Sequence, residues 1–153
     1  MTKKPLSPEV YARMSQAAKQ GREAWRRGDI PAAERHFVEA WNTLPEPKSE
    51  QDYAQSLAWG LVEFYRDTKQ CEKATQWLRA LRELYGPHSD SSLDFLAGTV
   101  AFECEDLDTA FRLFRQLYLE FGKRPFEGSD PKYLDFYERR FGPLSGRTPQ
   151  DGL

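Results

Sequence analysis

The sequence has few of the residues on which enzymes and metal proteins depend. It contains two histidines and two cysteines in 153 residues, and the cysteines lack the CxxC spacing of zinc and redox sites. No P-loop, dinucleotide-binding glycine motif or Gly-x-Ser-x-Gly elbow is present. We therefore expect no catalytic residue, no metal ion and no cofactor.

Long runs of one kind of residue are also absent. No apolar run approaches the ~18 residues of a membrane span, and the first lysines are not followed by the apolar stretch of a secretory signal. Basic and acidic side chains number 22 and 24 and are interspersed, whereas binding to a phosphate backbone requires clustered cations. The sequence predicts a cytoplasmic protein with free thiols that binds neither membranes nor nucleic acids.

Aromatic residues, in contrast, are abundant, with ten Phe, seven Tyr and four Trp. They bury a large area per residue, and the length of the chain suits one ordinary domain. We expect a single domain over residues 8–142, between a flexible N-terminus (1–7) and a flexible tail (143–153).

Proline and glycine divide the chain into helical segments. Ser7-Pro8-Glu9 has the residues of a helix start, and Gly28-Asp29 those of a helix end followed by the cap of the next helix. No stretch alternates with the period of two that strands require, so the fold is predicted to be all α. The helices are expected at about 8–27, 31–44, 50–68, 72–85, 91–103, 107–121 and 130–142.

The first six helices are expected to form three similar pairs. The second helix of each pair has an alanine near its start and a large apolar residue four positions later. These pairs are Ala33 and Phe37, Ala74 and Leu78, and Ala110 and Phe114. Twelve positions before each alanine lie Gly21, Val62 and Gly98, where paired helices would cross most closely. The alanines are 41 and 36 residues apart, which indicates a repeat of about 34 residues with short insertions.

This pattern resembles the tetratricopeptide repeat (TPR) over roughly residues 14–122. The first unit matches best, whereas the second has Val62 at the usual small position and the third replaces the turn glycine with Glu105. The resemblance implies an α-solenoid of antiparallel helix pairs in a right-handed superhelix, with about seven helices. Its units are expected at about 14–47, 55–87 and 91–122. An amphipathic helix at 130–142, with Tyr133, Leu134, Tyr137 and Phe141 on its apolar side, would cap the stack.

The resemblance also implies a concave groove, lined by the first helix of each pair, in which the family binds peptides. Carried over by position, the groove residues are Lys19, Arg22, Trp25 and Arg26 in the first unit, Trp59, Glu63 and Arg66 in the second, and Phe95, Thr99 and Phe102 in the third. The family's clamp for acidic chaperone C-termini is absent, because Ala18, Arg22, Gly60, Ser92 and Leu96 occupy its positions. Tryptophan and arginine often anchor interfaces, which favours a protein or peptide partner with aliphatic and acidic groups.

The chain is therefore predicted to be a bacterial adaptor that binds another protein without catalysis. A secretion chaperone and a toxin-immunity protein remain open as alternatives. So does a thiol-based redox sensor or enzyme using Cys71, because that residue begins a helix, where the pKa of a thiol is lowered. It also remains open whether the aromatic residues pack inside the stack, whether the C-terminal helix fills the groove, and whether the chain forms a homodimer.

Overall fold

The computed structural model describes residues 3–145, and the side chains of residues 3–141. In this range the chain is all α, as the sequence predicts, with seven α-helices, two short 3-10 helices and no strand. The α-helices are α1 (Pro8–Arg26), α2 (Ile30–Asn42), α3 (Ala54–Asp67), α4 (Cys71–Tyr85), α5 (Ser91–Glu103), α6 (Leu107–Phe121) and α7 (Pro131–Ser145). The 3-10 helices are η1 (Lys48–Glu50) and η2 (Arg124–Phe126).

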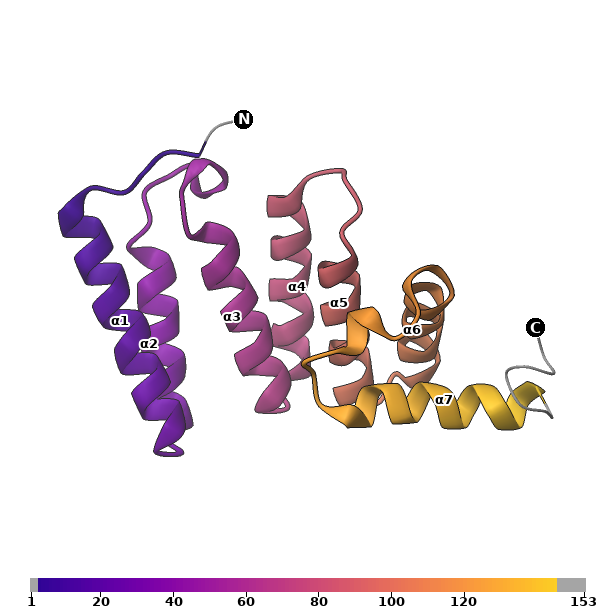
Figure 1. The fold of residues 1–153 in the computed structure, drawn as a ribbon. Coiled ribbons are helices and arrows are strands. Elements are labelled where there is room, and N and C mark those ends of the chain that lie inside the picture. The colour runs from indigo at the N-terminus through magenta and orange to yellow at the C-terminus, as the bar shows by residue number, and fades with distance from the viewer. Residues whose placement is uncertain (1–2, 146–153) are drawn as a thin grey trace. The chain divides into compact units, whose positions relative to one another are not determined.

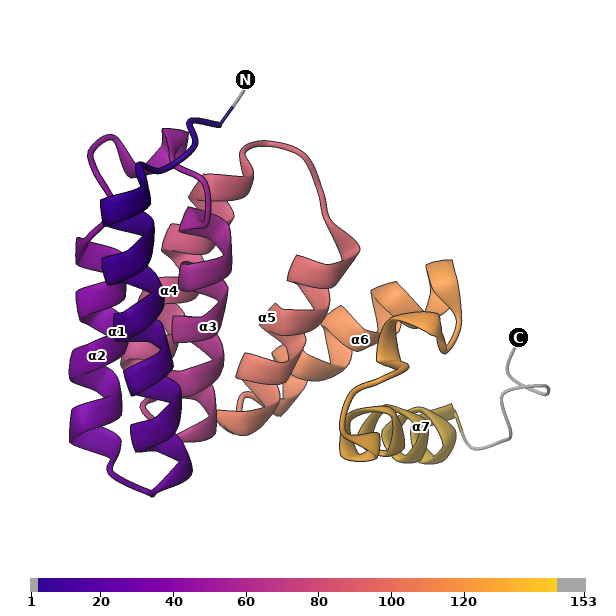
Figure 2. The same ribbon diagram turned by 60° about the vertical axis from the view of Figure 1, so that its left-hand side comes forward.

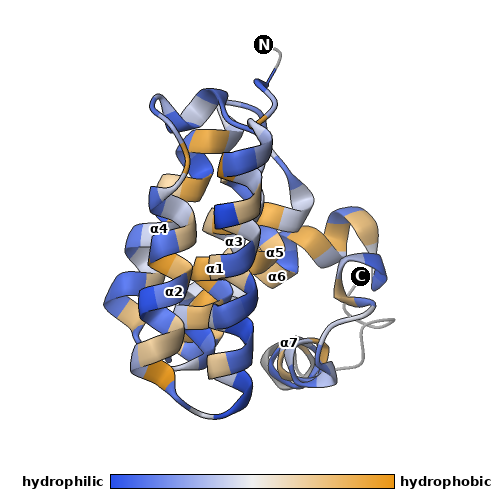
Figure 3. Cartoon of the chain, turned by 90° about the vertical axis from the view of Figure 1, so that its left-hand side faces the viewer, coloured by the Kyte–Doolittle hydropathy of each residue, from blue (hydrophilic) through white to orange (hydrophobic). Residues whose placement is uncertain are grey.

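Two compact units make up the chain, residues 1–87 and residues 88–153. The first contains the helix pairs α1–α2 and α3–α4, and the second contains the pair α5–α6 followed by α7. Figure 1 shows the two helices of each pair side by side and antiparallel. In the first unit, hydrophilic and hydrophobic residues are mixed along α1 and α2 (Figure 3), as expected of helices that are buried on one side.

The three turns within the pairs share one backbone conformation. Each turn is three residues long, and its middle residue is left-handed: Gly28 with φ 82°, Lys69 with φ 61° and Glu105 with φ 64°. In each, the amide of the last turn residue donates to a carbonyl five residues earlier. These bonds join Asp29 to Ala24 at 2.9 Å, Gln70 to Tyr65 at 2.8 Å and Asp106 to Ala101 at 2.9 Å. The repeat seen in the sequence is therefore also a repeat of backbone geometry.

Close helix crossings occur at the predicted glycines. A Cβ atom added to Gly21 would lie 2.7 Å from the ring of Phe37, and one added to Gly98 would lie 2.5 Å from the ring of Phe114. Only glycine permits so close an approach. The second pair has the fully buried Val62 at this position and the smaller Leu78 in place of phenylalanine.

The two pairs of the first unit are joined by an aromatic contact and a polar network. Phe64 of α3 is fully buried, with its ring centroid 5.3 Å from that of Phe37 on α2. The Tyr65 hydroxyl donates to Glu34 at 2.8 Å, and the Lys73 ammonium donates to the same carboxylate at 2.7 Å. The bond from Lys73 lowers the pKa of Glu34, whereas burial, and then the bond to Glu34, raises the pKa of Tyr65. One carboxylate thus connects α2, α3 and α4.

The start of α3 and the end of α7 differ from the prediction. The predicted helix at 50–68 begins at Ala54, because Gln51 is extended and Tyr53 is left-handed with φ 73°. α7 continues through Gly142 and Pro143 to Ser145, because one proline removes a single helical hydrogen bond and need not end a helix. Residues 146–153 of the predicted tail lie outside the described part of the chain.

The N-terminal segment is anchored to the segment that precedes α3. Lys4 forms a parallel bridge with Gln51, its amide donating to Glu50 at 2.7 Å and its carbonyl accepting from Asp52 at 3.1 Å. The Lys4 ammonium also pairs with the Glu50 carboxylate at 2.9 Å. Part of the segment predicted to be flexible is therefore held against the first unit.

The second unit is built around an aromatic core. α7 crosses α5 and α6 at a steep angle instead of lying parallel to them (Figures 1 and 2). Tyr133 and Tyr137 of α7, predicted to be on its apolar side, are buried, as is Phe126 of η2, which the sequence placed in a plain loop. They pack with Ala101, Ala110 and Phe114, so α7 and η2 cover one side of the α5–α6 pair.

Candidate functional site

The predicted groove residues are divided between the two units. Seven lie in the first unit, on α1 and α3, and the remaining three lie on α5 in the second. Each set is therefore considered within its own unit.

The residues on α1 form a basic and aromatic surface. Arg22 and Arg26 are exposed, lie one helical turn apart and, with the half-buried Trp25, line a hollow of about 390 Å³. Lys19 is exposed on the preceding turn. Within residues 3–141, none of these three cations forms an ion pair. The hollow is thus bordered by two exposed arginine residues, neither of which is held in an ion pair within the described side chains.

Trp25 also holds this surface against α3. Its ring lies edge-on to Phe64, with 5.1 Å between centroids, and edge-on to Phe37 at 6.1 Å. One side of the indole therefore belongs to the core between the helix pairs, and the other borders the hollow. Because Phe64 is fully buried, the position of Trp25 is set by packing.

The predicted residues on α3 have other contacts. Trp59 is half-buried and packs at a tilt against Tyr85, with 6.4 Å between centroids. Arg66 donates to both carboxylate oxygens of its neighbour Asp67, at 2.7 and 3.2 Å. Glu63 is half-buried. The unpaired positive charge of this region therefore lies on α1.

Of the three predicted residues on α5, Thr99 is buried, and Phe95 and Phe102 are half-buried against other aromatic side chains of the second unit. Phe102 lies edge-on to Tyr133 and Phe136 of α7, with centroids 5.4 and 5.1 Å away. Phe95 contacts Phe126 at 5.2 Å. Thr99 is 1% exposed, and its hydroxyl donates to the Leu96 carbonyl at 2.7 Å. The position of Phe95 and Phe102 in the repeat cannot reveal that α7 and η2 cover them.

Three residues near the α1 surface gain importance only from the structure. Tyr11 and Tyr53 are 45% and 46% exposed, yet their rings lie 5.5 Å apart at the starts of α1 and α3. Gly60, in the middle of α3, has no atom within 4 Å of the place where a Cβ would be. The sequence signals were a tyrosine near the start of two successive first helices and a glycine inside a helix.

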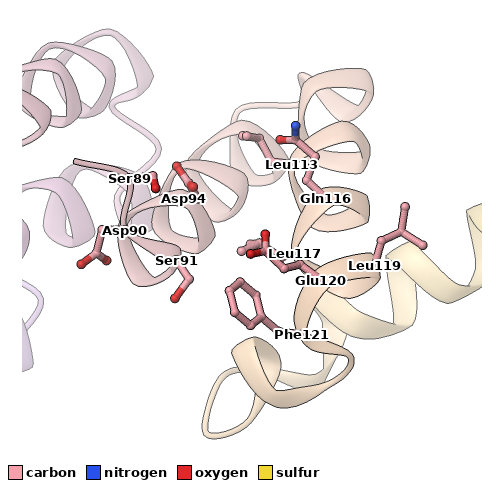
Figure 4. Close-up of a pocket in the computed structure, with 10 residues that line it drawn as sticks. All are labelled: Ser89, Asp90, Ser91, Asp94, Leu113, Gln116, Leu117, Leu119, Glu120 and Phe121. Carbon is pink, nitrogen blue, oxygen red and sulfur yellow. The ribbon is translucent and has the colours of Figure 1, made fainter. Parts of the chain in front are cut away.

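A second hollow, of about 760 Å³, lies in the second unit between the start of α5 and the end of α6 (Figure 4). Asp90, Asp94 and Glu120 give it an acidic side, and the exposed Leu119 and Phe121 give it apolar side chains. Asp90 also caps α5 by accepting from the Leu93 amide at 3.0 Å. None of these residues was predicted as a site.

The expectation from the sequence that both cysteines are free thiols is wrong. No cysteine in the described part of the chain is free, and both Cys71 and Cys104 are disulfide-bonded. Sequence spacing could not predict this, because the sulfur that a cysteine meets is decided by the fold. The inference from free thiols to a reducing compartment fails with it, and thiol chemistry at Cys71 would first require reduction.

Groups for other chemistry are sparse between residues 3 and 141. No three His, Cys, Asp or Glu side chains there are arranged so that they could hold a metal ion. His36 pairs with the exposed Glu39 of its own helix, at 3.4 Å. No helix in the described range is both long and apolar enough to cross a membrane.

Comparisons with known proteins add no family to this description. Neither the protein-family models, nor the curated proteins, nor the solved structures contain a match to the chain.

Proposed function

We propose that the chain binds another protein without catalysis, and that the α1 surface of the first unit is the binding site. The observation that carries this proposal is the hollow lined by Arg22, Trp25 and Arg26. Arginine and tryptophan are the side chains that most often dominate binding energy at protein interfaces. Here both arginines are exposed and without an acidic partner in the described range, while the packing of Trp25 keeps its ring in place.

The chemistry of this surface favours a partner with acidic and apolar groups. A guanidinium can donate two parallel hydrogen bonds to one carboxylate, and such charge-assisted bonds are stronger than neutral ones. The open edge of the Trp25 indole offers apolar area beside them. A partner segment with a carboxylate next to an aliphatic side chain would satisfy both features.

The repeated turns and the glycine crossings support a further part of the proposal, that the helix pairs are units of the TPR type. In that arrangement α1 and α3 are the first helices of successive units and line the side on which a partner lies. An adaptor role and a bacterial origin are parts of the same proposal.

The proposal is tested by reversing the charge of the hollow. Wild-type protein and the Arg22→Glu, Arg26→Glu double variant would be immobilised and used to capture proteins from a lysate of the source cells, followed by quantitative mass spectrometry. Loss of two interface anchors should lower the amount of a specific partner by about ten-fold or more.

The matched control is Arg35→Glu with Arg79→Glu, which removes two exposed cations from α2 and α4 of the same unit. It should retain the partner, and circular dichroism should show that both double variants are folded. Equal capture by the wild type and the Arg22, Arg26 variant would disprove the assignment of the site.

A further inference from the structure

Two residues of the first unit are locally unfavourable for the backbone at their positions. The backbone of Tyr53 is left-handed, a conformation that residues with bulky side chains rarely adopt. Its side chain is 46% exposed, so burial in the core does not account for this conformation. Gly60 occupies the middle of α3, where alanine or leucine would favour the helix more than glycine does, and no neighbouring atom requires a glycine. Such departures from local stability occur most often at binding sites.

Both residues lie beside the α1 surface. Tyr53 lies at the start of α3, and Gly60 lies one helical turn before Phe64, which contacts Trp25 of α1. The Tyr53 ring meets Tyr11 of α1, and Tyr11 precedes Arg22 by eleven residues, or about three turns. One side of α1 therefore has a tyrosine near its start and two arginines near its end.

The charges on this side of α1 are mostly positive. Lys19, Arg22 and Arg26 follow Tyr11 on this side, and Glu23, four residues after Lys19 and three before Arg26, is the acidic residue among them. On α3 the half-buried Glu63 lies beyond Gly60. A carboxylate on a partner would therefore be attracted to α1 and repelled from the later part of α3.

We propose that one segment of the partner lies lengthwise over α1 and α3, with an apolar side chain on the Tyr11–Tyr53 pair and carboxylates at Arg22 and Arg26. Its nearest approach to α3 is at Gly60, where the missing side chain exposes the helix backbone. This inference rests on the proposed function and adds the direction and spacing of the bound segment.

The spacing follows from helix geometry. At a rise of about 1.5 Å per residue, Arg22 and Arg26 lie about 16 and 22 Å from Tyr11 along α1. A helical partner segment needs its acidic groups about 11 and 15 residues from the apolar one, whereas an extended segment needs about 5 to 7 residues.

The test is selection from a random library of 16-residue peptides displayed on phage, followed by fluorescence anisotropy with the selected peptide. Selected peptides should combine an apolar residue with acidic residues at one of these two spacings. Gly60→Leu should weaken binding of the selected peptide by about ten-fold, because it fills the space over α3. Tyr53→Gly should also weaken binding, by about five-fold, because it removes half of the aromatic pair.

Thermal unfolding distinguishes these effects from loss of structure. Gly60→Leu and Tyr53→Gly should both keep or raise the melting temperature, because leucine favours a helix and glycine accepts a positive φ. The matched control, Thr75→Leu, adds the same side chain to an exposed position of α4 and should bind normally.

Failure of this inference can be separated from failure of the proposed function. The inference alone is wrong if the Arg22, Arg26 variant loses its partner while Gly60→Leu and Tyr53→Gly bind the peptide like the wild type. It is equally overturned if selection yields no peptide, or only peptides without the acidic residues. Retention of the captured partner by the Arg22, Arg26 variant refutes the proposed function itself.

Discussion

The glycine crossings lead to a graded prediction about stability. Replacing Gly98 by alanine would place a methyl group 2.5 and 2.9 Å from two ring carbons of Phe114. That ring is fully buried and lies against Phe95, Phe126 and Phe136, so it has little room to move. We expect Gly98→Ala to destabilise the protein.

The magnitude comes from two opposing effects. Alanine is favoured over glycine inside a helix by about 1 kcal/mol, whereas forcing a methyl group into a packed core costs about 1 to 3 kcal/mol. Because two contacts fall below 3.0 Å, the cost should be near the upper end, and the net loss about 1 to 2 kcal/mol. For a chain of this size the melting temperature should fall by about 3 to 6 °C.

Two other glycines give internal comparisons. Gly21→Ala should destabilise less, because the Phe37 ring that it meets at 2.7 Å is only half-buried and can shift. Gly60→Ala should stabilise by about 1 kcal/mol, because nothing opposes the gain in helix propensity. Urea unfolding followed by circular dichroism would measure all three. Tryptophan fluorescence would not suffice, because all four tryptophans lie in the first unit.

A double-mutant cycle tests the cause. Phe114→Leu alone should destabilise, but in the Gly98→Ala background it should cost less, because the smaller side chain removes the clash. In the second helix pair, Val62 and Leu78 occupy the positions of Gly98 and Phe114, so a residue with a Cβ already occurs there opposite a leucine. If Gly98→Ala is as stable as Gly60→Ala, or if the cycle shows no favourable coupling, the close crossing of α5 and α6 is not what requires a glycine.

Three further predictions concern the rest of the molecule. Glu34→Gln should destabilise by about 1 to 2 kcal/mol in urea unfolding, because it replaces the charged acceptor of Lys73 and Tyr65. Because the pKa of Glu34 is lowered, its contribution to the free energy of unfolding is complete at neutral pH and is lost on acidification below about pH 4. Unfolding measured at several pH values should show this loss for the wild type but not for the variant. Glu105→Gly should stabilise by about 0.5 to 1 kcal/mol, because Glu105 is left-handed, and unchanged stability would contradict this reasoning. Alkylation of the unfolded protein should label neither cysteine before reduction and both after it, as read by intact mass; labelling without a reductant would argue against the disulfide-bonded state.

Much of the helical structure could be predicted because its signals are local. Ser7, Asp29, Asp90 and Asp106 each accept from a backbone amide three residues later, which is a property of a few adjacent residues. The crossings at Gly21 and Gly98 could be predicted because a small residue and an aromatic recur sixteen positions apart. Lys69 and Glu105 adopt the left-handed turn conformation of Gly28 without being glycine, so the repeat fixes that conformation even where the residue disfavours it.

The candidate site was predicted only in part. Arg22, Trp25 and Arg26 could be named from their positions in the first unit, because three residues on adjacent turns of one helix lie together in any fold that exposes this side. Phe95 and Phe102 have equivalent positions in the repeat, yet their exposure depends on α7 and η2, more than twenty residues away in the sequence.

By itself the sequence determined the helices, their caps, the three repeated turns and the two glycine crossings, because each depends on residues within a few turns of one another. The tertiary structure decided which side chains remain exposed, that Tyr11 meets Tyr53, that Gly60 lies open and that the cysteines are disulfide-bonded. Exposure and contact depend on segments that are distant in the chain, and no local pattern specifies how these segments meet.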